Sequence, residues 1–242
     1  MLRFIVFITK LVITTAVALL FASCQFDSGI NGNGNVTTES RPADAEFTSV
    51  EASRGLEVEI QQADKKSITV ITDSNLQTHI LTDITNGVLT ITSDQNIRSS
   101  ESQKVIVTMP ISVALQSSSA AEIKSKSMLK SDDLSLNASS GSEMEVAVEG
   151  ENLDVETSSG SNIKISGKII KLKTAASSGS EIDAEKAMSN NVTAQASSGS
   201  NIGVYPLVSL DAKASSGGNV TYHNNPKDGV VRKASSGGTI SK

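Results

Sequence analysis

The sequence predicts an all-β protein, a right-handed parallel β-solenoid (β-helix) that follows a β-rich N-terminal region containing a hairpin. A Ser-Ser-Gly phrase recurs with glycines 18 to 20 residues apart, a period typical of stacked coils. Apolar and polar residues alternate around each of these glycines, as they do in half-buried strands. Trp is absent and aromatic residues make up 3% of the chain, which suits closely stacked small side chains. The right hand follows from the general rule for parallel crossovers.

Residues 1–23 are typical of an export signal. Arg3 and Lys10 supply a basic beginning, residues 11–22 are mostly apolar, and small residues precede Cys24. This apolar stretch is shorter than the roughly 20 residues that span a membrane. We therefore expect residues 1–23 to be removed, and the alternative is an uncleaved membrane anchor.

Cys24 is the only cysteine of the chain, so it cannot form an internal disulfide. The segment Leu20–Cys24 resembles the lipobox of bacterial lipoproteins, although Phe21 departs from the usual Leu, Val or Ile. The resemblance implies a lipid on Cys24, and buried acyl chains contribute about 0.8 kcal/mol per CH₂ group. Because Gln25 stands where Asp retains some lipoproteins at the inner membrane, we expect an outer-membrane lipoprotein that faces the periplasm or the cell surface.

The charge of the mature chain argues against a nucleic-acid partner. The full chain of 242 residues can hold one or two domains with a substantial core. Removing Arg3 and Lys10 from the 21 basic residues leaves 19 against 26 acidic ones, a formal charge of about −7. The remaining basic residues are scattered rather than clustered, so we expect no nucleic acid to bind.

Residues 24–45 are rich in Gly, Asn, Ser and Thr, which predicts a flexible tether or a loosely attached first loop. The Gly-x-Gly run lacks the strand, the helix and the Lys-Ser/Thr pair of a phosphate-binding loop. A set of short motifs runs through this stretch and the residues after it: Gly29–Val36, Arg41, Phe47–Val50, Leu56–Ile60, Ile68–Val70, Asn75-Leu76 and Asn86–Ile91. In this order the motifs resemble the opening of a bacterial family called putative auto-transporter adhesin, head GIN domain.

The resemblance continues into the serine-glycine repeats and covers nearly the whole mature chain. It departs at Ser117–Ala121, where alanines replace the glycine-rich turn of the relatives. The resemblance implies a right-handed β-helix and an adhesive or other surface-interaction role.

Residues 46–115 are predicted to form the β-rich N-terminal part of this domain. Alternation in 56–60 and 68–70 predicts strands with one solvated face. Asn86-Gly87 predicts a two-residue hairpin turn, since both positions need positive φ. Residues 73–77 are expected to start a short helical turn, and 105–109 to form a buried strand that Pro110 closes.

Residues 116–242 are predicted to form the solenoid, with a structural turn at each phrase. The turn glycines are Gly141, Gly160, Gly179, Gly199, Gly217 and Gly237. The residues seven positions before these glycines are Leu134, Leu153, Leu172, Val192, Leu210 and Val230. The residues three positions before them are Ala138, Thr157, Ala176, Ala196, Ala214 and Ala234. The residues three positions after the glycines are Met144, Ile163, Ile182, Ile202, Val220 and Ile240. The residues five positions after them are Val146, Ile165, Ala184, Val204 and Tyr222. These inward columns also accommodate Val113, Leu115 and Ile123 around Ala120, which predicts one further, degenerate coil.

The outward columns are predicted to avoid like charges on neighbouring coils, which lie about 4.8 Å apart. One column alternates as Glu145, Lys164 and Asp183, and in another Asp154 is followed by Lys173. Another outward column forms the candidate ligand face: Glu143, Asn162, Glu181, Asn201 and Asn219.

Catalytic, metal and cofactor sites are not expected. The Ser-Ser-Gly phrase is not a nucleophile elbow, it occurs six times, and only His79 and His223 are available as bases. Neither the calcium-binding nonapeptide nor a cysteine–histidine metal motif is present. Some β-solenoids are glycan lyases or hydrolases that use clustered carboxylates. The acidic candidates here are spread over several columns: Asp132, Asp133, Glu143, Glu145, Asp154 and Asp183. Among the aromatics, only Tyr205 is expected to face outward, because Tyr222 falls on an inward column.

The final coil is expected to close the stack. Arg232 and Lys242 occupy columns that are apolar and inward in earlier coils. A charged last coil would prevent further strand addition.

We therefore expect an exported, lipid-anchored, non-catalytic binding or scaffold protein of the bacterial envelope. The expected partners are a membrane, reached through Cys24, and a glycan or protein surface ligand. Two alternatives remain: a glycan-active β-helix enzyme, and a structural lipoprotein confined to the periplasm.

Overall fold

The computed structural model describes Lys10 and residues 29–242. Apart from Lys10, the expected export signal lies outside the described residues, and so does Cys24. No helix within the described part of the chain is long and apolar enough to cross a membrane.

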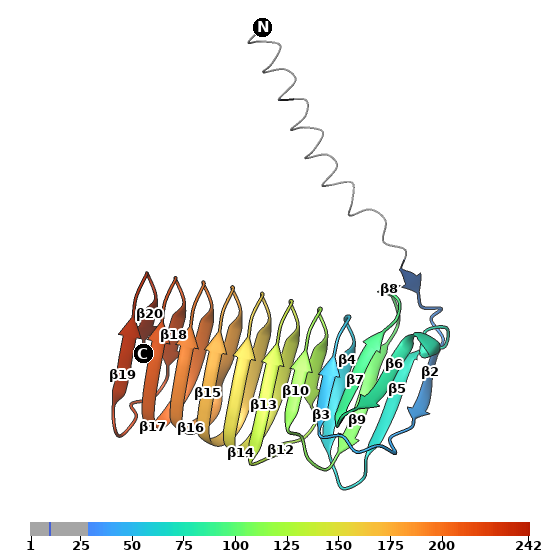
Figure 1. Cartoon of the computed structure of the whole chain (residues 1–242), viewed down its shortest axis with the longest axis horizontal. Coiled ribbons are helices and arrows are strands. Elements are labelled where there is room, and N and C mark those ends of the chain that lie inside the picture. The colour runs from blue at the N-terminus through green and yellow to red at the C-terminus, as the bar shows by residue number, and fades with distance from the viewer. Residues whose placement is uncertain (1–9, 11–28) are drawn as a thin grey trace.

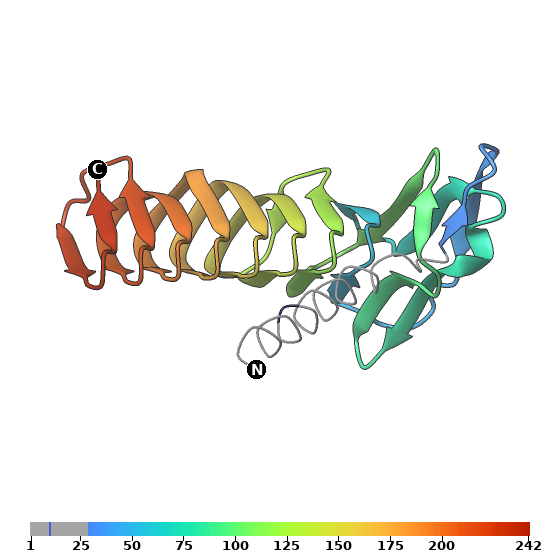
Figure 2. The same cartoon turned by 90° about the horizontal axis from the view of Figure 1, so that it is seen from above.

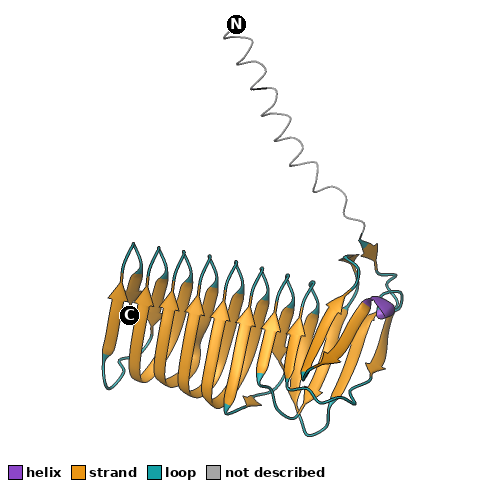
Figure 3. Ribbon diagram, viewed as in Figure 1, coloured by secondary structure: helices purple, strands orange, loops and turns teal. Residues whose placement is uncertain are grey.

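The predicted all-β solenoid is confirmed: two parallel sheets lie face to face along most of the molecule (Figures 1 and 3). Ser-Ser-Gly turns connect the sheets along the upper edge in Figure 1, and wider bends connect them along the lower edge. We call the strands after each turn the post-turn sheet and those before it the pre-turn sheet. Four long strands bend to contribute to both sheets: β14 (Glu143–Thr157), β15 (Asn162–Ala176), β16 (Glu181–Ala196) and β17 (Asn201–Ala214).

The remaining solenoid strands each belong to one sheet or lie at the bends. The post-turn sheet contains β4 (Glu57–Gln62), β11 (Glu122–Ser125), β18 (Asn219–Tyr222) and β20 (Thr239–Ser241). The pre-turn sheet contains β3 (Ser49–Ala52), β10 (Ala114–Ser117), β13 (Asp133–Ala138) and β19 (Val230–Ala234). The short β12 (Leu129–Lys130) pairs with β14 at its bend.

The strand register confirms the predicted inward columns. Ile163 pairs with Met144 on one side and Ile182 on the other, and the same alignment continues from coil to coil. The column members are buried from Leu134 to Tyr222, whereas those of the last coil, which has no coil beyond it, are not. The core is therefore a continuous row of small and medium apolar side chains between the sheets.

Each Ser-Ser-Gly turn contains two consecutive residues with positive φ. The φ of Gly141 is 70° and that of Ser140 is 55°. The Ser142 N–H donates to the Ser139 carbonyl at 3.2 Å, so the turn has the type I′ form, which requires positive φ at both central positions. The sequence predicted the glycine conformation but not that of the serine, an uncommon residue in the left-handed region.

A buried, structural serine follows four of the six turn glycines, whereas Gly217 and Gly237 are followed by a second glycine. Ser142, Ser161, Ser180 and Ser200 are all buried, and each hydroxyl contacts a carbonyl of the preceding coil. The Ser180 hydroxyl lies 3.0 Å from the Thr157 carbonyl oxygen and accepts from the Ser177 N–H at 3.2 Å. These serines bond successive coils together inside the stack.

Ser180→Ala is expected to lower the free energy of unfolding by about 1–2 kcal/mol, because it leaves buried polar backbone groups without one partner. Urea denaturation measures this loss. Ser178→Ala, at the exposed position of the same turn, is the matched control and should change stability by less than about 0.5 kcal/mol. Equal effects of the two substitutions would contradict the structural role of the buried serine.

The stack begins earlier than the predicted boundary at residue 116. Strands β3 and β4 form a coil around Gly55, and pair in parallel with β10 and β11. The turn at Arg54 and Gly55 has φ values of 61° and 72°, like the later turns. The signal was present in the sequence, because Val50 and Val58 stand five residues before and three after Gly55.

The degenerate coil around Ala120 is confirmed for Leu115 and Ile123, which are buried in register with the core. Val113 is wrong as a core position, since 44% of it is exposed. It precedes β10, which starts at Ala114, and therefore lies outside the regular pairing. Ser119 and Ala120 both have positive φ, so the alanine turn keeps the backbone form of the others.

Both sheets continue into an antiparallel head (Figure 2, right). Strands β7 (Val88–Ser93) and β9 (Gln103–Met109) stack in parallel on β3 and β4. Three antiparallel strands then extend the sheets: β6 (Ile80–Thr85) on β7, β5 (Ser67–Asp73) on β9, and β2 (Val36–Arg41) on β5. A separate parallel pair joins β1 (Ile30–Asn31) to β8 (Ile97–Ser99).

The local predictions for the head largely hold. The β6–β7 hairpin is confirmed, with φ of 51° at Asn86 and 81° at Gly87. The strand before Pro110 is confirmed as β9, whose alternate residues are buried. The helical turn expected at 73–77 is realised slightly later, as the 3₁₀ helix η2 (Gln77–His79).

The predicted flexible tether at 24–45 is wrong for residues 30–41. These residues contain β1 and β2, which pair with β8 and β5. Composition predicted a loose chain because it cannot reveal partners that lie many residues away.

The last coil closes the core as well as carrying charge. Arg232 pairs with Ala212 on an inward column, as predicted. Its guanidinium group lies over the ring of buried Tyr222, 5.2 Å from the centroid, and donates a hydrogen bond to the phenol oxygen. Arg232 thus covers the last buried aromatic side chain where another coil would otherwise stack.

Arg232→Val is expected to promote self-association, because it exposes an apolar strand edge at the end of the stack. Size-exclusion chromatography at increasing concentration should reveal oligomers or loss of soluble protein. Lys233→Val removes the same charge from the adjacent outward position and is the matched control. An Arg232→Val protein that stayed as soluble and monomeric as the wild type would contradict the capping role.

Candidate ligand-binding surfaces

The candidate ligand face forms one row on the outer side of the post-turn sheet. Glu143, Asn162, Glu181, Asn201 and Asn219 pair in register from β14 to β18, and all are at least partly exposed. We call these five residues the outer row. They present alternating carboxylates and amides at first, and then two successive amides, at a spacing of one coil.

The outer row continues toward the head with stacked glutamates, so the expected avoidance of like charges fails there. Glu57 pairs with Glu122, which pairs with Glu143. Lysines offset the repulsion: Lys104 lies 3.1 Å from Glu57, and Lys124 lies 2.5 Å from Glu122. The hydrogen bond to Glu122 raises the pKa of Lys124 above its ordinary value.

The adjacent column alternates in charge, as predicted. Glu59, Lys124, Glu145, Lys164 and Asp183 lie in register. Hydrogen bonds from Lys126 and Lys104 hold the pKa of Glu59 below its usual value. Each of these partly exposed ion pairs contributes at most about 1 kcal/mol.

The acidic candidates do not gather at one site: Glu143 and Glu145 line one small depression, and Asp132 lines a different one. Asp132 lies at a bend and Asp133 at the start of β13, whereas Asp154 lies 3.6 Å from Lys173 on the pre-turn sheet. Within the described residues, no group of three or more His, Cys, Asp or Glu side chains is placed to hold a metal ion. The histidines are in different regions: His79 contacts Asp94 at 2.8 Å and His223 contacts Glu185 at 2.9 Å.

A second polar surface runs beside the turns, on the outer side of the pre-turn sheet. It is a groove of about 560 Å³ that crosses several coils and is lined by the first serine of successive Ser-Ser-Gly phrases. We call it the serine groove. Its other lining residues include Asn137, Glu156, Ala175, Gln195, Lys213 and Lys233. The outward positions could be predicted from the repeats, but this groove could not, because it arises from the projection of the turns.

The glycine-rich N-terminal segment wraps around one buried carboxylate, that of Asp73 at the end of β5. Its oxygens accept hydrogen bonds from the N–H groups of Gly34 at 2.5 Å, Glu101 at 2.9 Å and Ser102 at 3.4 Å. A Cβ on Gly32 would lie 2.6 Å from the Asp73 carboxylate. We call Asp73, Gly32 and Gly34, with Glu101 and Ser102, the carboxylate lock.

Desolvation alone would raise the pKa of Asp73, but the backbone donors, led by Gly34, outweigh it and hold the pKa below the ordinary value. Asparagines extend the lock, since Asn33 N–H donates to the Asn75 side chain and Asn75 Nδ2 donates to the Asn31 carbonyl. The sequence motif at 29–36 is therefore a docking element for the head.

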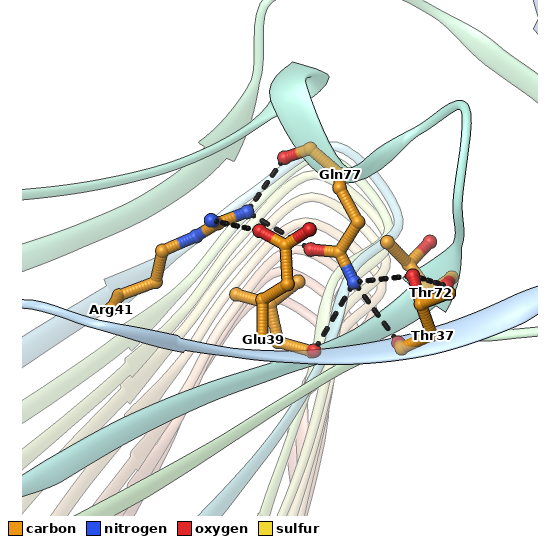
Figure 4. A network of polar contacts seen from close by, with 6 residues as sticks. Thr37, Glu39, Arg41, Thr72 and Gln77 are labelled. Carbon is orange, nitrogen blue, oxygen red and sulfur yellow. Dashed lines mark hydrogen bonds and ion pairs between the residues drawn. The ribbon is translucent and has the colours of Figure 1, made fainter.

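A neighbouring network fixes β2 against η2 (Figure 4). One Arg41 nitrogen donates to both the carbonyl and the side-chain oxygen of Gln77, at 2.7 and 2.9 Å, and the other contacts Glu39 at 2.6 Å. Gln77, which is buried, donates to the Thr37 carbonyl at 3.0 Å. These contacts hold the first strand on the head, so residues 36–41 are part of its folded structure.

Comparison with known proteins finds one matching family and several solved structures with the same fold. The family model described as putative auto-transporter adhesin, head GIN domain, matches residues 46–226. None of the curated proteins matches the chain.

Several solved structures share the fold over 88% of this chain. A putative adhesin from Bacteroides fragilis has 17% identity, a TM-score of 0.78 and 99% of its own length covered. A putative adhesin from Parabacteroides merdae has 20% identity and a TM-score of 0.72, with 98% of its length covered. A protein from Parabacteroides distasonis described as a putative lipid binding protein has 18% identity and a TM-score of 0.70, also with 98% covered.

Proposed function

Because the chain belongs to the family of putative auto-transporter adhesins with a head GIN domain, we propose that it is a non-catalytic binding and scaffold module of the bacterial envelope. The observation that best supports this proposal is that two surfaces, the outer row and the serine groove, run across several coils of the two-sheet stack. On both surfaces, hydrogen-bonding groups recur at the spacing of one coil, about 4.8 Å. Such a surface suits an extended ligand, a glycan or a protein segment, better than a small substrate.

The proposed anchor is a lipid on Cys24. Strand β1 begins at Ile30, so a short segment separates the lipid from the folded head. Anchoring there would hold the head near the membrane and leave the far end of the stack, at β19 and β20, free to meet a ligand (Figure 1).

Metabolic labelling with a radioactive fatty acid tests the anchor. We expect label on the wild-type protein and none on Cys24→Ser, which should also leave the detergent phase in phase partitioning. Protease treatment of intact cells then separates a surface location, where the domain is cleaved, from a periplasmic one, where it is protected. Fatty-acid labelling that persists in Cys24→Ser would contradict the anchor.

A glycan array combined with hydrolysis assays tests the binding role. We expect saturable binding without turnover. Ala175→Trp should abolish binding in the serine groove by filling it, whereas Lys173→Trp, two residues away on the same strand, should not. Turnover that is lost in an Asp132→Asn, Asp133→Asn protein would instead support a glycan-active enzyme.

A further inference from the structure

Another groove lies at the bends, on the edge opposite the serine turns. It has a volume of about 910 Å³, within the range of pockets that hold small molecules. Its apolar lining consists of Ile111, Ile169, Ile170, Met188 and Leu207. We call this the bend groove, and it is separate from the outer row and the serine groove.

Exposed apolar side chains gather at this edge. Of the seven large apolar side chains that are exposed among the described residues, Ile111, Ile170 and Met188 line the bend groove. A fourth, Met128, lines an adjoining depression that shares Met188 and Lys168 with the groove. Exposed apolar area is unfavourable in water relative to burial, and a contiguous patch of this kind marks an interaction site.

The bends do not repeat as the turns do. The β15–β16 register shifts between Lys164 and Ser166, and the β16–β17 register shifts between Ala184 and Met188. Irregularities of this kind change the direction in which side chains point, and they are enriched beside functional sites. The turns have nearly constant φ values in every coil, so the irregular bends are a local property of this edge and not a demand of stacking.

The groove is bordered by two lysines, Lys130 and Lys168, and by two carboxylates, Asp132 and Glu149. Lys130 lies 3.9 Å from Glu149, but Lys168 and Lys186 make no ion pair with any described residue. Lys168 borders both the groove and the adjoining depression, and Lys186 borders the depression. Two unpaired ammonium groups beside an apolar floor match a ligand with a hydrocarbon tail and an anionic head.

We propose that the bend groove binds one anionic amphiphile, with the tail against Ile169, Ile170, Met188 and Leu207 and the head group at Lys168 and Lys186. Methionine adapts its shape to flexible chains, and the lysine stems can lie along the apolar surface while their charges reach the head group. This site goes beyond the proposed surface-ligand function and does not depend on it.

A fluorescence titration tests the proposal: NBD-labelled laurate is added to the full chain carrying Cys24→Ser. Unlabelled laurate, below its micelle concentration, is then used to displace the labelled ligand. We expect saturable one-to-one binding, and weaker displacement by lauryl alcohol, which has the same tail without the charge. Met188→Glu should weaken binding at least about tenfold, equivalent to about 1.4 kcal/mol. Lys168→Glu should reduce the preference for laurate over lauryl alcohol.

Val231→Glu is the matched control, because Val231 is 54% exposed on the last coil while Met188 is 43% exposed in the groove. It should bind laurate like the parent chain, and circular dichroism should show all variants folded. The proposal is overturned if laurate does not bind saturably, or if Met188→Glu and Val231→Glu behave alike. It is also overturned if anionic phosphatidylglycerol vesicles bind through the groove but monomeric laurate does not, since the site would then be a bilayer surface.

Discussion

Gly167→Ala is expected to lower the free energy of unfolding by about 4 kcal/mol, at the upper end for single substitutions. Gly167 lies at the bend of β15 with φ of 125°, and a Cβ there would lie 1.9 Å from the Val148 carbonyl oxygen. Val148 pairs with Gly167 in the ladder, so the obstacle is backbone that cannot rotate away. The coil must open at the bend, and positive φ adds strain for any residue with a side chain.

Urea denaturation measures this loss, and Gly141→Ala is the matched control. Gly141 has φ of 70°, but no atom lies within 4 Å of a Cβ added there. We expect the control to lose about 1 kcal/mol, from backbone conformation alone. Similar losses in the two variants would show that the close approach at the bend does not limit stability.

Asp73→Asn is expected to detach the N-terminal glycine-rich segment from the head. The amide replaces one accepting oxygen with an N–H donor, which then faces the backbone donors of Gly34, Glu101 or Ser102. Residues 29–35 should exchange their amide protons faster and become sensitive to protease, and the melting temperature should fall. Asp83→Asn, at an exposed position of β6, should leave all three measurements unchanged.

The carboxylate lock also predicts an acid transition. Because the pKa of Asp73 is lowered in the folded protein, its contribution is complete above the ordinary carboxyl value of 3.8. It is lost as the pH falls below that value through the native pKa. Asp73→Asn should be less stable than the wild type at neutral pH, and its stability should fall less over this acid range. A wild type and variant with parallel stability curves below pH 3.8 would contradict the lock.

The repeats made much of the solenoid predictable. Equivalent positions of parallel coils stack directly on one another, so a column such as Ile163, Ile182 and Ile202 reveals its inward face by repetition alone. The same reasoning located the outer row and the capping position of Arg232. It missed the coil around Gly55 because that coil carries the columns without the Ser-Ser-Gly phrase.

The grooves were not predictable from the columns. The serine groove depends on how far the turns project, and the bend groove depends on register shifts such as that between Ala184 and Met188. Periodicity describes what the coils share, whereas these surfaces arise where the coils differ or where their edges protrude.

The fold class, the turn glycines, the inward columns and the N-terminal hairpin could be predicted from the sequence, because each rests on contacts between neighbours in sequence or between equivalent positions of the repeats. The folded structure was needed to show that residues 30–41 pair with the head and that both sheets continue from the head into the stack. Asp73 joins Gly34 to Glu101 through one buried carboxylate. A glycine-rich composition indicates freedom of the chain, but the distant donors and acceptors that remove this freedom become visible only when the chain is folded.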